Sequence, residues 1–361
     1  MSDVILTVSG VIDPDQAAAA ERGERPRPDY VEIARAVEAQ LLDYTAARRS
    51  SRLLGSCIEK VAGKNALLAW ACFARRADVS TIVSDGEQVG IPLALLLKWL
   101  GRGPRAVRHV MIGHALGAKK KAVFFEWLGA QSHVDTFLVY ASAQKELLER
   151  RFGVPSERVR VIPFQVDTRF YSPEVAEREP NDEVPPAADT PLVCAIGLER
   201  RDYATLLKAV RGMPLRLVIT ASSAWSKQVS STTGEAIPDN VIVKKFSYAG
   251  LRKLYQASAF MVMPLQDVDF AAGITAILEA MAMKRAVVCS RAPGQTDLVV
   301  DGQTGVYVPV GDVERMQSAL RDLLADPERA RVMGERGAAL VQERASLEKY
   351  VEVLKAVIRP S

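Results

Sequence analysis

Residues 271–283 form the stretch AAGITAILEAMAM, which contains one charged residue, Glu279, in an otherwise apolar run. The apolar residues recur at the spacing of one helix face, which predicts a helix that begins near Ile274. The preceding Ala-Ala-Gly has small side chains that leave the first backbone amides of the helix uncovered. The helix face that we expect to be buried is formed by Ile274, Ile277, Leu278 and Met281.

Glu279 lies on a second face of this helix together with Thr275, four residues earlier. The strand-like segments MVMPL and AVVCS on either side put the helix N-terminus at the carboxyl end of a parallel sheet, where ligands bind. Free amides at a helix N-terminus attract phosphate, and Glu279, about one turn deeper, is suited to accept hydrogen bonds from a sugar hydroxyl. From these residues alone, the alternative is a core helix whose glutamate is paired with an arginine.

The rest of the chain alternates short apolar strands with longer helical patterns, one of them around YVEIARAVEAQLLDY (30–44). This alternation is typical of parallel sheets with crossover helices. The segment 173–191 is rich in proline and acidic residues, has no apolar periodicity and is predicted to be a surface linker. The predicted strands are 4–9, 81–84, 108–113, 136–141 and 159–164 before this linker, and 192–197, 215–220, 240–246, 259–265, 286–290 and 305–310 after it.

Two sets of alternating elements in 361 residues predict two doubly wound, Rossmann-like α/β domains that face a cleft. The N-terminal domain, on the acceptor side, is expected at 1–172 and the second domain, which binds the donor, at 192–344. A C-terminal helix at about 345–361 is expected to pack back on the N-terminal domain.

The composition is that of a globular protein, with 48% hydrophobic and 25% charged residues and a net charge of +4. So mild a charge does not favour a nucleic-acid-binding protein. The first residues lack the pattern of a signal peptide, and the longest apolar runs reach about half a membrane span. The four cysteines form no CxxC pair and are expected to be reduced and structural, which favours a cytoplasmic protein.

Several motifs of the second domain occur together in one known family. LEAMA (278–282) is followed by the strand AVVCS and by APGQTDLVVDGQTGVYVPVGD (292–312). VIPFQVDTRFY (161–171) lies at the domain junction, and YATLLKA (203–209) follows the first strand of the second domain. With these motifs the chain resembles, from about residue 80 to about residue 345, the retaining GT-B glycosyltransferases of family 4.

The resemblance implies an enzyme that moves a sugar from a nucleotide-diphosphate sugar to a hydroxyl acceptor with retention at the anomeric carbon, and without a metal or another cofactor. The acceptor is expected to be a glycan, a lipid or a small metabolite. In this family the glutamate of LEAMA binds ribose, helix-start amides hold the diphosphate, and two cations neutralise the charge that the leaving diphosphate gains. The donor-binding residues implied here are Glu279, Gly273, Ile274, Thr275, Arg200, Arg201 and, through backbone contacts to the base, Lys245 and Phe246.

The resemblance also assigns residues of the N-terminal domain. His114, in the stretch GHALGAKKK, matches a family histidine near the donor sugar, where it orients the sugar and polarises the catalytic site. Gly10 matches the loop that meets the acceptor, whereas His109 and His133 lack such a context. The basic and aromatic segment AKKKAVFFEWLG (118–129) indicates peripheral contact with the inner face of a membrane, or alternatively a helix with a basic end and a buried aromatic face.

One position departs from the family pattern. Ala271 stands where the family has another glutamate, which faces the sugar eight residues before Glu279. This departure favours a second hypothesis, a catalytically degenerate protein that binds nucleotide or a partner without turnover. A third hypothesis, epimerisation of a nucleotide sugar, needs acidic residues in the sugar pocket that the sequence does not place there. Asp267 and Asp269 have the spacing of a metal-binding pair, but glycosyltransferases with such pairs have a different fold, so no metal is expected.

Overall fold

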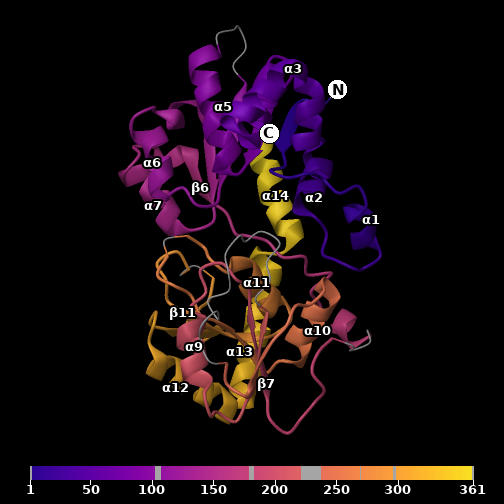
Figure 1. Cartoon of the computed structure of the whole chain (residues 1–361), viewed down its shortest axis with the longest axis vertical. Helices are drawn as coiled ribbons and strands as arrows, with labels where there is room; N and C mark the ends of the chain where they lie inside the picture. Colours follow the sequence, from indigo (N-terminus) through magenta and orange to yellow (C-terminus); the bar gives the residue numbers. More distant parts are fainter. Residues whose placement is uncertain are drawn as a thin grey trace. The chain divides into compact units, whose positions relative to one another are not determined.

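The computed structural model describes residues 2–101, 107–178, 183–220, 237–268, 270–295 and 298–359. The chain divides into two compact units, each built on a six-stranded parallel sheet (Figure 1). This confirms the predicted fold class of two Rossmann-like α/β units. The first unit contains residues 1–18, 27–162 and 350–361, and the second contains residues 19–26 and 163–349.

The strands of the first unit are β1 (Val4–Thr7), β2 (Gln40–Leu42), β3 (Thr81–Asp85), β4 (Arg108–Gly113), β5 (Thr136–Val139) and β6 (Val159–Val161). Its helices are α2 (Asp29–Val37), α3 (Tyr44–Ala62), α4 (Lys64–Ala74), α5 (Glu87–Leu100), α6 (Lys119–Glu126), α7 (Ser142–Arg150) and α14 (Leu347–Ile358). It also contains the short 3₁₀ helices η1 (Ala130–His133) and η2 (Ser156–Arg158). Helix α1 (Gln16–Glu21) begins in the first unit and ends in the second. The sheet order is β2-β1-β3-β4-β5-β6. Its apolar core has one cluster around Ile5 and Ile82 with α3, α4 and α5, and another around Met111 and Phe137 with α5, α6 and α7.

The strands of the second unit are β7 (Leu192–Ile196), β8 (Arg216–Thr220), β9 (Val241–Val243), β10 (Phe260–Met263), β11 (Ala286–Ser290) and β12 (Gly305–Val308). Its helices are α8 (Pro173–Glu177), α9 (Tyr203–Val210), α10 (Tyr248–Ala257), α11 (Ile274–Ala282), α12 (Val313–Ala325) and α13 (Pro327–Arg344). The sheet order is β12-β11-β10-β7-β8-β9. Side chains of α9 and α12 pack on one face of this sheet, around Phe260 and Val262, while α10 and α11 contact β7 and β10.

Every strand predicted from the sequence is present, and the structure adds one, β2. The prediction of a helix around residues 30–44 is therefore wrong beyond Val37. Helix α2 ends at Val37 because Glu38 adopts the left-handed conformation, with φ of 52°, and the Ala39 N–H turns back to the Ala34 carbonyl at 2.9 Å. The residues that follow pair with β1 instead, which buries Leu42.

The segment 173–191, predicted as a surface linker, is partly structured. It begins with helix α8, capped by the Ser172 side chain, which accepts the Val175 N–H. Further on, the Glu183 carboxylate accepts the Ser247 N–H at 3.0 Å, and Val184 is buried. These contacts hold the described parts of the segment on the second unit. The sequence pattern did not predict them, because a single cap and a single buried side chain produce no apolar periodicity.

The division between the units differs from the predicted one. It falls after Ile162 instead of after residue 172, and residues 19–26 belong to the second unit. Helix α14 joins the first unit from Tyr350 onward. There the Tyr350 and Tyr140 hydroxyls lie 2.7 Å apart, and Arg108 Nη1 donates to the Val357 carbonyl at 2.7 Å.

Each sheet contains a point where the strand order reverses, between β1 and β3 in the first unit and between β7 and β10 in the second. Ligands of open α/β sheets bind outside the carboxyl ends of the strands at such points. In the second unit the loops that follow β7 and β10 are held together there. The Gln266 N–H donates to the Arg200 carbonyl at 3.0 Å, and the Asp202 N–H donates to the Pro264 carbonyl at 2.9 Å.

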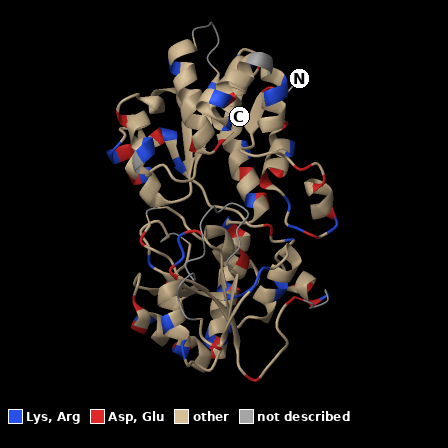
Figure 2. Ribbon diagram, viewed as in Figure 1, with Lys and Arg blue, Asp and Glu red and all other residues tan. Residues whose placement is uncertain are grey.

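The surface carries charges of both signs. Lysine and arginine are interspersed with aspartate and glutamate over the helices of both units (Figure 2). None of the helices in the described ranges has the length and apolar character needed to cross a membrane. All four cysteines are free thiols, with Cys72, Cys194 and Cys289 buried and Cys57 exposed.

Candidate functional site

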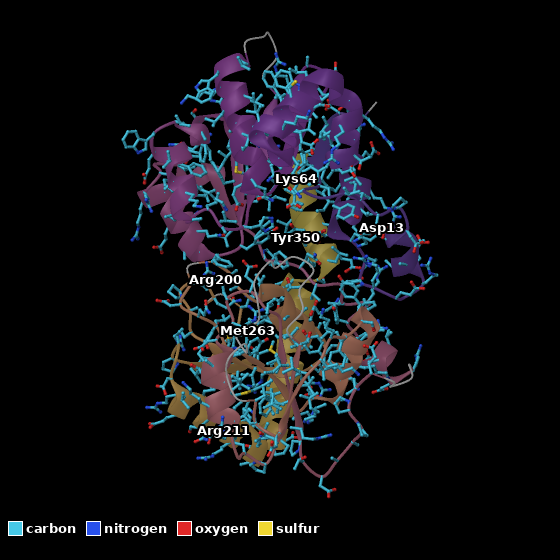
Figure 3. All side chains as sticks on the ribbon, viewed as in Figure 1. Asp13, Lys64, Arg200, Arg211, Met263 and Tyr350 are labelled. Carbon is cyan, nitrogen blue, oxygen red and sulfur yellow. The ribbon has the colours of Figure 1, made fainter. Side chains whose placement is uncertain are left out.

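Helix α11 begins at Ile274, as predicted, and its N-terminus is open. Gly273 precedes it with φ of 77°, a conformation that residues with a side chain rarely adopt. A Cβ atom on Gly273 would lie 2.6 Å from Sδ of Met263, which is labelled in Figure 3, and 3.2 Å from Arg201 Nη2. The first bond within the helix runs from the Ile277 N–H to the Gly273 carbonyl, so the amides before Ile277 have no acceptor within the helix.

The guanidinium of Arg201 lies directly beside this helix start. Arg201 is buried, with 6% of its surface exposed, and donates from Nε to the Ile196 carbonyl at 3.0 Å and from Nη1 to the Glu199 carbonyl at 2.6 Å. A Cβ atom on Gly197, which has φ of 100°, would lie 2.5 Å from Arg201 Nη2. Two glycines, Gly197 and Gly273, thus leave room for one guanidinium between the end of β7 and the start of α11. Burial lowers the pKa of Arg201 from its ordinary value.

Arg200 has a different environment from Arg201. Its side chain is exposed and forms no hydrogen bond or ion pair with a described residue, whereas its carbonyl accepts the Gln266 N–H (Figure 3). Its backbone is left-handed, with φ of 56°, which is uncommon for a residue other than glycine. The turn at Arg200 thus directs the next side chain, that of Arg201, into the protein.

Glu279 is buried about one and a half turns into α11, with 7% of its surface exposed. Its Oε2 accepts the Tyr255 hydroxyl at 2.9 Å. Burial raises the pKa of Glu279 to about 7, and the Tyr255 and Tyr171 hydroxyls act in the opposite direction. Within the ranges that the structure describes, the Glu279 carboxyl forms no ion pair. The alternative prediction, a core glutamate paired with an arginine, is therefore wrong for these residues.

The remaining donor-side residues lie in two places. The four apolar residues predicted to face the core, Ile274 among them, are buried, while Thr275 is exposed. Lys245 is exposed and Phe246 is half-buried, just beyond the end of β9. Because β9 is two strands from β7, they are about 10 Å from the β7 line of the sheet. The structure therefore brings together Arg201, Gly273 and the start of α11, and leaves Lys245 and Phe246 at the edge strand.

In the first unit, His114 follows β4 next to a carboxylate that ends β3. His114 Nε2 lies 3.1 Å from Asp85 Oδ1, and both side chains are about two-fifths exposed. Burial acts to lower the pKa of His114, but Asp85, with smaller contributions from Glu87 and Asp29, outweighs it and raises the pKa. The tilted ring of Tyr140 lies 5.4 Å from the imidazole.

A buried glutamate, Glu87, fixes the backbone that carries this histidine. Its carboxylate accepts the N–H groups of His114 at 2.8 Å and Ala115 at 3.3 Å, and it is paired with Lys121. Burial acts to raise the pKa of Glu87, but Lys121 and these amides outweigh it and lower the pKa. The Gln144 amide donates to the His114 carbonyl at 2.7 Å. The loop after β4 is therefore held from both sides, and His114 has little freedom to move.

The other N-terminal candidates have simpler surroundings. Gly10 follows β1 at the point of strand reversal, and a Cβ atom there would meet nothing within 4 Å. His109 is fully buried, with its Nε2 2.9 Å from Ser84 Oγ, and burial lowers its pKa to about 4. Burial also lowers the pKa of His133. His109 is thus a neutral core residue, in keeping with its lack of functional context in the sequence.

The sequence analysis did not name several residues that lie at these candidate sites. They are Asp85, Gly197 and the tyrosines around Glu279. Asp85 could have been found, because it directly follows one predicted strand and His114 directly follows the next, and these strands are neighbours in the parallel sheet. Gly197 also ends a predicted strand, but nothing in the sequence says that an arginine fills the space beside it. Tyr171 and Tyr255 have no signal, since they are far from Glu279 along the chain.

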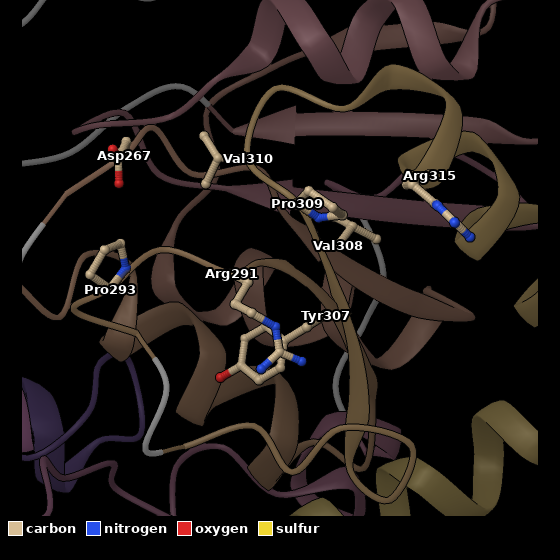
Figure 4. Close-up of a pocket in the computed structure, with 8 residues that line it drawn as sticks. All are labelled: Asp267, Arg291, Pro293, Tyr307, Val308, Pro309, Val310 and Arg315. Carbon is tan, nitrogen blue, oxygen red and sulfur yellow. The ribbon is translucent and has the colours of Figure 1, made fainter.

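The second unit also has a cavity of about 670 Å³ at the ends of β10, β11 and β12 (Figure 4). The Arg291 guanidinium stacks on the Tyr307 ring at 4.5 Å and pairs with Asp301 at 2.7 Å. Asp267 lies at its rim, and Asp269 is outside the described residues. The lining residues are Asp267, Arg291, Pro293, Tyr307, Val308, Pro309, Val310 and Arg315, so this cavity is separate from the Arg201 group.

Comparison with known proteins identifies relatives of this chain. A family model described as "Glycosyl transferases group 1" matches residues 198–326, from the loop after β7 to the end of α12. The alpha-D-kanosaminyltransferase of Streptomyces kanamyceticus is 26% identical over 232 residues, which are 62% of this chain and 59% of that protein. A GDP-mannose-dependent alpha-(1-6)-phosphatidylinositol monomannoside mannosyltransferase of Mycolicibacterium smegmatis is 28% identical over 265 residues, 68% of each chain. The matched part thus spans less than two thirds of the kanosaminyltransferase.

Among solved structures, Anabaena HepE in complex with UDP and glucose has a TM-score of 0.70 and 12% identity, over 100% of each chain. This similarity concerns the fold, which is that of the GT-B class. With the family match in the second unit, it confirms the resemblance found in the sequence. The second unit thus resembles the group 1 glycosyltransferases over residues 198–326, and the chain has the GT-B fold.

Replacing Asp85 by asparagine should lower the pKa of His114. The carboxylate raises that pKa against the effect of burial, so its removal leaves burial opposed only by the smaller contributions of Glu87 and Asp29. Proton NMR titration of the three histidines would measure the change. His133, which does not contact Asp85, is the internal control, and an unchanged His114 titration in the variant would contradict the assignment.

Replacing Glu279 by glutamine should make stability less dependent on pH. The folded pKa of about 7 lies above the ordinary 4.5, so the unfolded state loses its proton first and the free energy of unfolding falls as pH rises from about 4.5 through 7. The difference of about 2.5 pH units corresponds to about 3 kcal/mol. Urea unfolding at pH 5 and pH 8 should show Glu279→Gln gaining on wild type by about 2.5 kcal/mol at the higher pH, because part of the effect is already present at pH 5.

The exposed Glu343, replaced in the same way, is the control for this measurement, since its side chain is 67% exposed. This variant measures the effect of losing an exposed carboxyl. A Glu279→Gln variant that differs from wild type by the same free energy at both pH values would argue that this carboxyl ionises at an ordinary pH.

Proposed function

We propose that this chain is a retaining glycosyltransferase that moves a sugar from a nucleotide-diphosphate sugar to a hydroxyl acceptor without a metal ion. The observation that supports this most directly is the buried Arg201 guanidinium beside the open N-terminus of α11. A fixed cation and backbone amides that have no acceptor within the helix converge there at the strand reversal of the second sheet. A diphosphate suits this arrangement, because its oxygens accept both kinds of hydrogen bond.

In the proposed reaction the donor diphosphate lies against Arg201 and the amides of residues 273–275. When the bond between the anomeric carbon and the phosphate oxygen breaks, negative charge grows on the leaving diphosphate. Arg201 is already held by two backbone carbonyls, so it stabilises that charge without reorganisation. Arg200 is proposed as a second, exposed cation. Because these groups neutralise the leaving group, the proposed reaction needs no metal.

Glu279 is proposed to accept hydrogen bonds from the ribose hydroxyls of the donor. The Tyr255 hydroxyl occupies one of its oxygens and thereby orients the carboxyl. Since its pKa is about 7, it becomes a pure acceptor as pH rises through neutrality, and donor affinity should rise over the same range. The base is proposed to be read by backbone groups near Lys245 and Phe246, beyond the end of β9.

In the first unit, His114 is proposed to orient the donor sugar and Gly10 to border the acceptor. Retention is proposed to follow attack by the acceptor hydroxyl on the face that the diphosphate leaves, with the leaving phosphate taking the proton. Asp85 favours the protonated form of His114, which suits a hydrogen-bond donor better than a general base. In this scheme no protein side chain forms a covalent intermediate.

A lipid or membrane-bound acceptor is proposed from the surface of α6. Val123, Phe124 and Trp127 are exposed, Trp127 by 82%, while the neighbouring Phe125 is buried. Lys98 Nζ donates to the Leu128 carbonyl at 2.8 Å and so ties the end of α5 to the end of α6.

The exposed Trp99 and Leu100 at that end of α5 thereby extend the apolar surface. Exposed Lys120 adds a positive charge suited to anionic lipid, whereas Lys121 is engaged with Glu87. The mannosyltransferase relative has a phosphatidylinositol monomannoside in its name, which also supports a lipid acceptor.

The degenerate alternative rests on Ala271. This residue lies in the turn before α11, where its carbonyl accepts the Ile274 N–H at 3.4 Å, and it brings no carboxylate to the sugar side. A protein that keeps the Arg201 group without turnover would bind nucleotide and fail to hydrolyse or transfer its sugar. Incubation with UDP- and GDP-sugars and a lipid extract, with and without EDTA, separates the two functions. The proposed enzyme releases nucleoside diphosphate both with and without EDTA, whereas the degenerate protein releases none.

Replacing Arg201 by lysine or glutamine should weaken binding of the preferred nucleoside diphosphate by roughly 10- to 100-fold, because a charge-assisted hydrogen bond to phosphate is lost. Isothermal titration calorimetry with UDP and GDP would measure it. Arg200→Gln is the matched control, and its loss should be smaller because that side chain is exposed to solvent. Equal affinities in wild type and both Arg201 variants would remove the proposed diphosphate site.

Replacing Phe124 and Trp127 by serine should reduce binding to vesicles that contain phosphatidylglycerol by roughly tenfold, since two apolar side chains leave the lipid. Cosedimentation with vesicles measures this. Val61→Ser, at a valine that is 89% exposed on α3, is the control for removal of an exposed apolar side chain. Equal sedimentation of wild type and the double variant would argue against a membrane surface at α6.

A further inference from the structure

The loop that follows β11 packs against the turn that leads into α11. The Gly294 N–H donates to the Val268 carbonyl at 3.0 Å. A Cβ atom on Gly294 would lie 2.3 Å from the Phe270 backbone nitrogen, so the two backbones meet at this glycine. One residue further along, Gln295 Nε2 donates to the Ala272 carbonyl at 2.8 Å. The loop after β11 therefore contacts the turn along its length, up to the residue before the N-cap of α11.

Gln295 is itself fixed within the second unit. It is buried, with 1% of its surface exposed, and its N–H donates to the Ala292 carbonyl at 2.9 Å. Its carbonyl accepts the Tyr307 hydroxyl at 2.6 Å. Tyr307 comes from β12 and lies beneath the Arg291 guanidinium (Figure 4). Because a buried amide without a partner is costly, the bond from the Gln295 side chain to the turn is a stable feature of the fold.

The bond to Ala272 also determines the direction of the Gly273 N–H. The Ala272 carbonyl and the Gly273 N–H belong to one peptide group, which is planar and trans, so they point in opposite directions. Since the carbonyl is directed at Gln295, the Gly273 N–H points away from the loop after β11. This N–H donates to no acceptor among the described residues, and it is one of the amides proposed to hold the diphosphate.

Glycine at position 273 makes such an anchor necessary. Gly273 has φ of 77°, but a glycine adopts positive and negative φ about equally readily, so the peptide group before it can rotate at little cost. In the opposite orientation the Ala272 carbonyl oxygen would face the bound phosphate and repel it. The Gln295 amide holds the carbonyl and so selects the orientation that presents an N–H to the anion.

We propose that Gln295 is a positioning residue for donor binding, which holds the Ala272–Gly273 peptide group so that its N–H faces a phosphate oxygen of the nucleotide-diphosphate sugar. This inference rests on the proposed function, since it assumes that the diphosphate binds at the start of α11. Because Gln295 is buried, it acts through the backbone of the turn. The loop after β11 thereby takes part in binding the donor.

Calorimetric titration of the full chain with inorganic pyrophosphate, UDP and GDP tests this. Gln295→Met keeps the length of the side chain and removes the N–H donor. It should weaken binding of pyrophosphate and of the preferred nucleoside diphosphate by the same factor, roughly five- to tenfold, because both ligands carry the diphosphate. Tyr307→Phe removes the hydroxyl that donates to the Gln295 carbonyl and should cause a smaller loss for both ligands.

The matched control is Asn240, at the amino end of β9. Its side-chain amide also donates to backbone carbonyls, those of Val210 at 3.0 Å and Leu215 at 3.2 Å. Asn240→Leu should lower the melting temperature and leave the affinity for pyrophosphate unchanged. Thermal melts establish which variants are folded, and if Gln295→Met is not, the milder Tyr307→Phe decides.

NMR reports on the peptide group directly. Labelling with [1-¹³C]alanine and [¹⁵N]glycine selects the three Ala–Gly peptide groups of the chain, 62–63, 249–250 and 272–273. The signal that disappears in Ala272→Ser belongs to Gly273, and the other two are internal controls. The Gly273 proton should shift downfield when pyrophosphate binds to wild type and shift less in Gln295→Met or Tyr307→Phe.

The outcomes separate this inference from the proposed function. Wild-type affinity and a wild-type Gly273 shift in the folded variants would overturn the inference, while a loss of affinity in Arg201→Gln would leave the proposed function standing. An equal loss of affinity in Asn240→Leu would also overturn the inference, because affinity would then follow stability alone. A wild-type protein that binds neither pyrophosphate nor a nucleotide would overturn the proposed function and this inference together.

Discussion

The candidate site of the second unit is built around a buried cation, Arg201. The Arg201 guanidinium fills the space between Gly197, at the end of β7, and Gly273, at the start of α11, and both glycines have a backbone conformation or a clearance that a side chain would not permit. A buried charge requires compensation, which Arg201 draws in part from the carbonyls of Ile196 and Glu199. The left-handed turn at Arg200 and the start of α11 at Gly273 lie next to this group, at the point where the strand order reverses.

Each unit holds charged side chains in place by hydrogen bonds at the carboxyl ends of its strands, a cation in the second unit and carboxylates in the first. In the second unit a cation is fixed beneath free amides, which prepares a point of positive potential for an anion. In the first unit two carboxylates act on one histidine: buried Glu87 fixes the backbone of the loop, and Asp85 faces the imidazole. In both, side chains at the carboxyl ends of strands are held by hydrogen bonds before any ligand arrives, which is the condition for electrostatic preorganisation.

Glu279 has a less favourable position, because a carboxyl with a pKa of about 7 is only partly ionised at neutral pH. Hydrogen bonds from tyrosine stabilise the ionised form less than an arginine would, and the remaining cost reduces the stability of the folded protein above neutral pH. Hydroxyl groups of a bound ligand would donate hydrogen bonds to the ionised Glu279 carboxyl and so reduce this free-energy cost.

The sequence by itself determined the elements and the order in which they occur. Apolar periodicity located every strand except β2 and placed the start of α11, because such periodicity is a local property of neighbouring residues. Motifs shared with a known family made Glu279 and Arg201 candidate site residues. Only the tertiary structure decided that Arg201 and not Arg200 faces Gly273, that tyrosines surround Glu279, that Asp85 faces His114, and that residues 19–26 join the second unit. These contacts join residues far apart in the chain, and their geometry depends on strand order and on backbone turns such as Glu38 and Arg200, which no local pattern encodes.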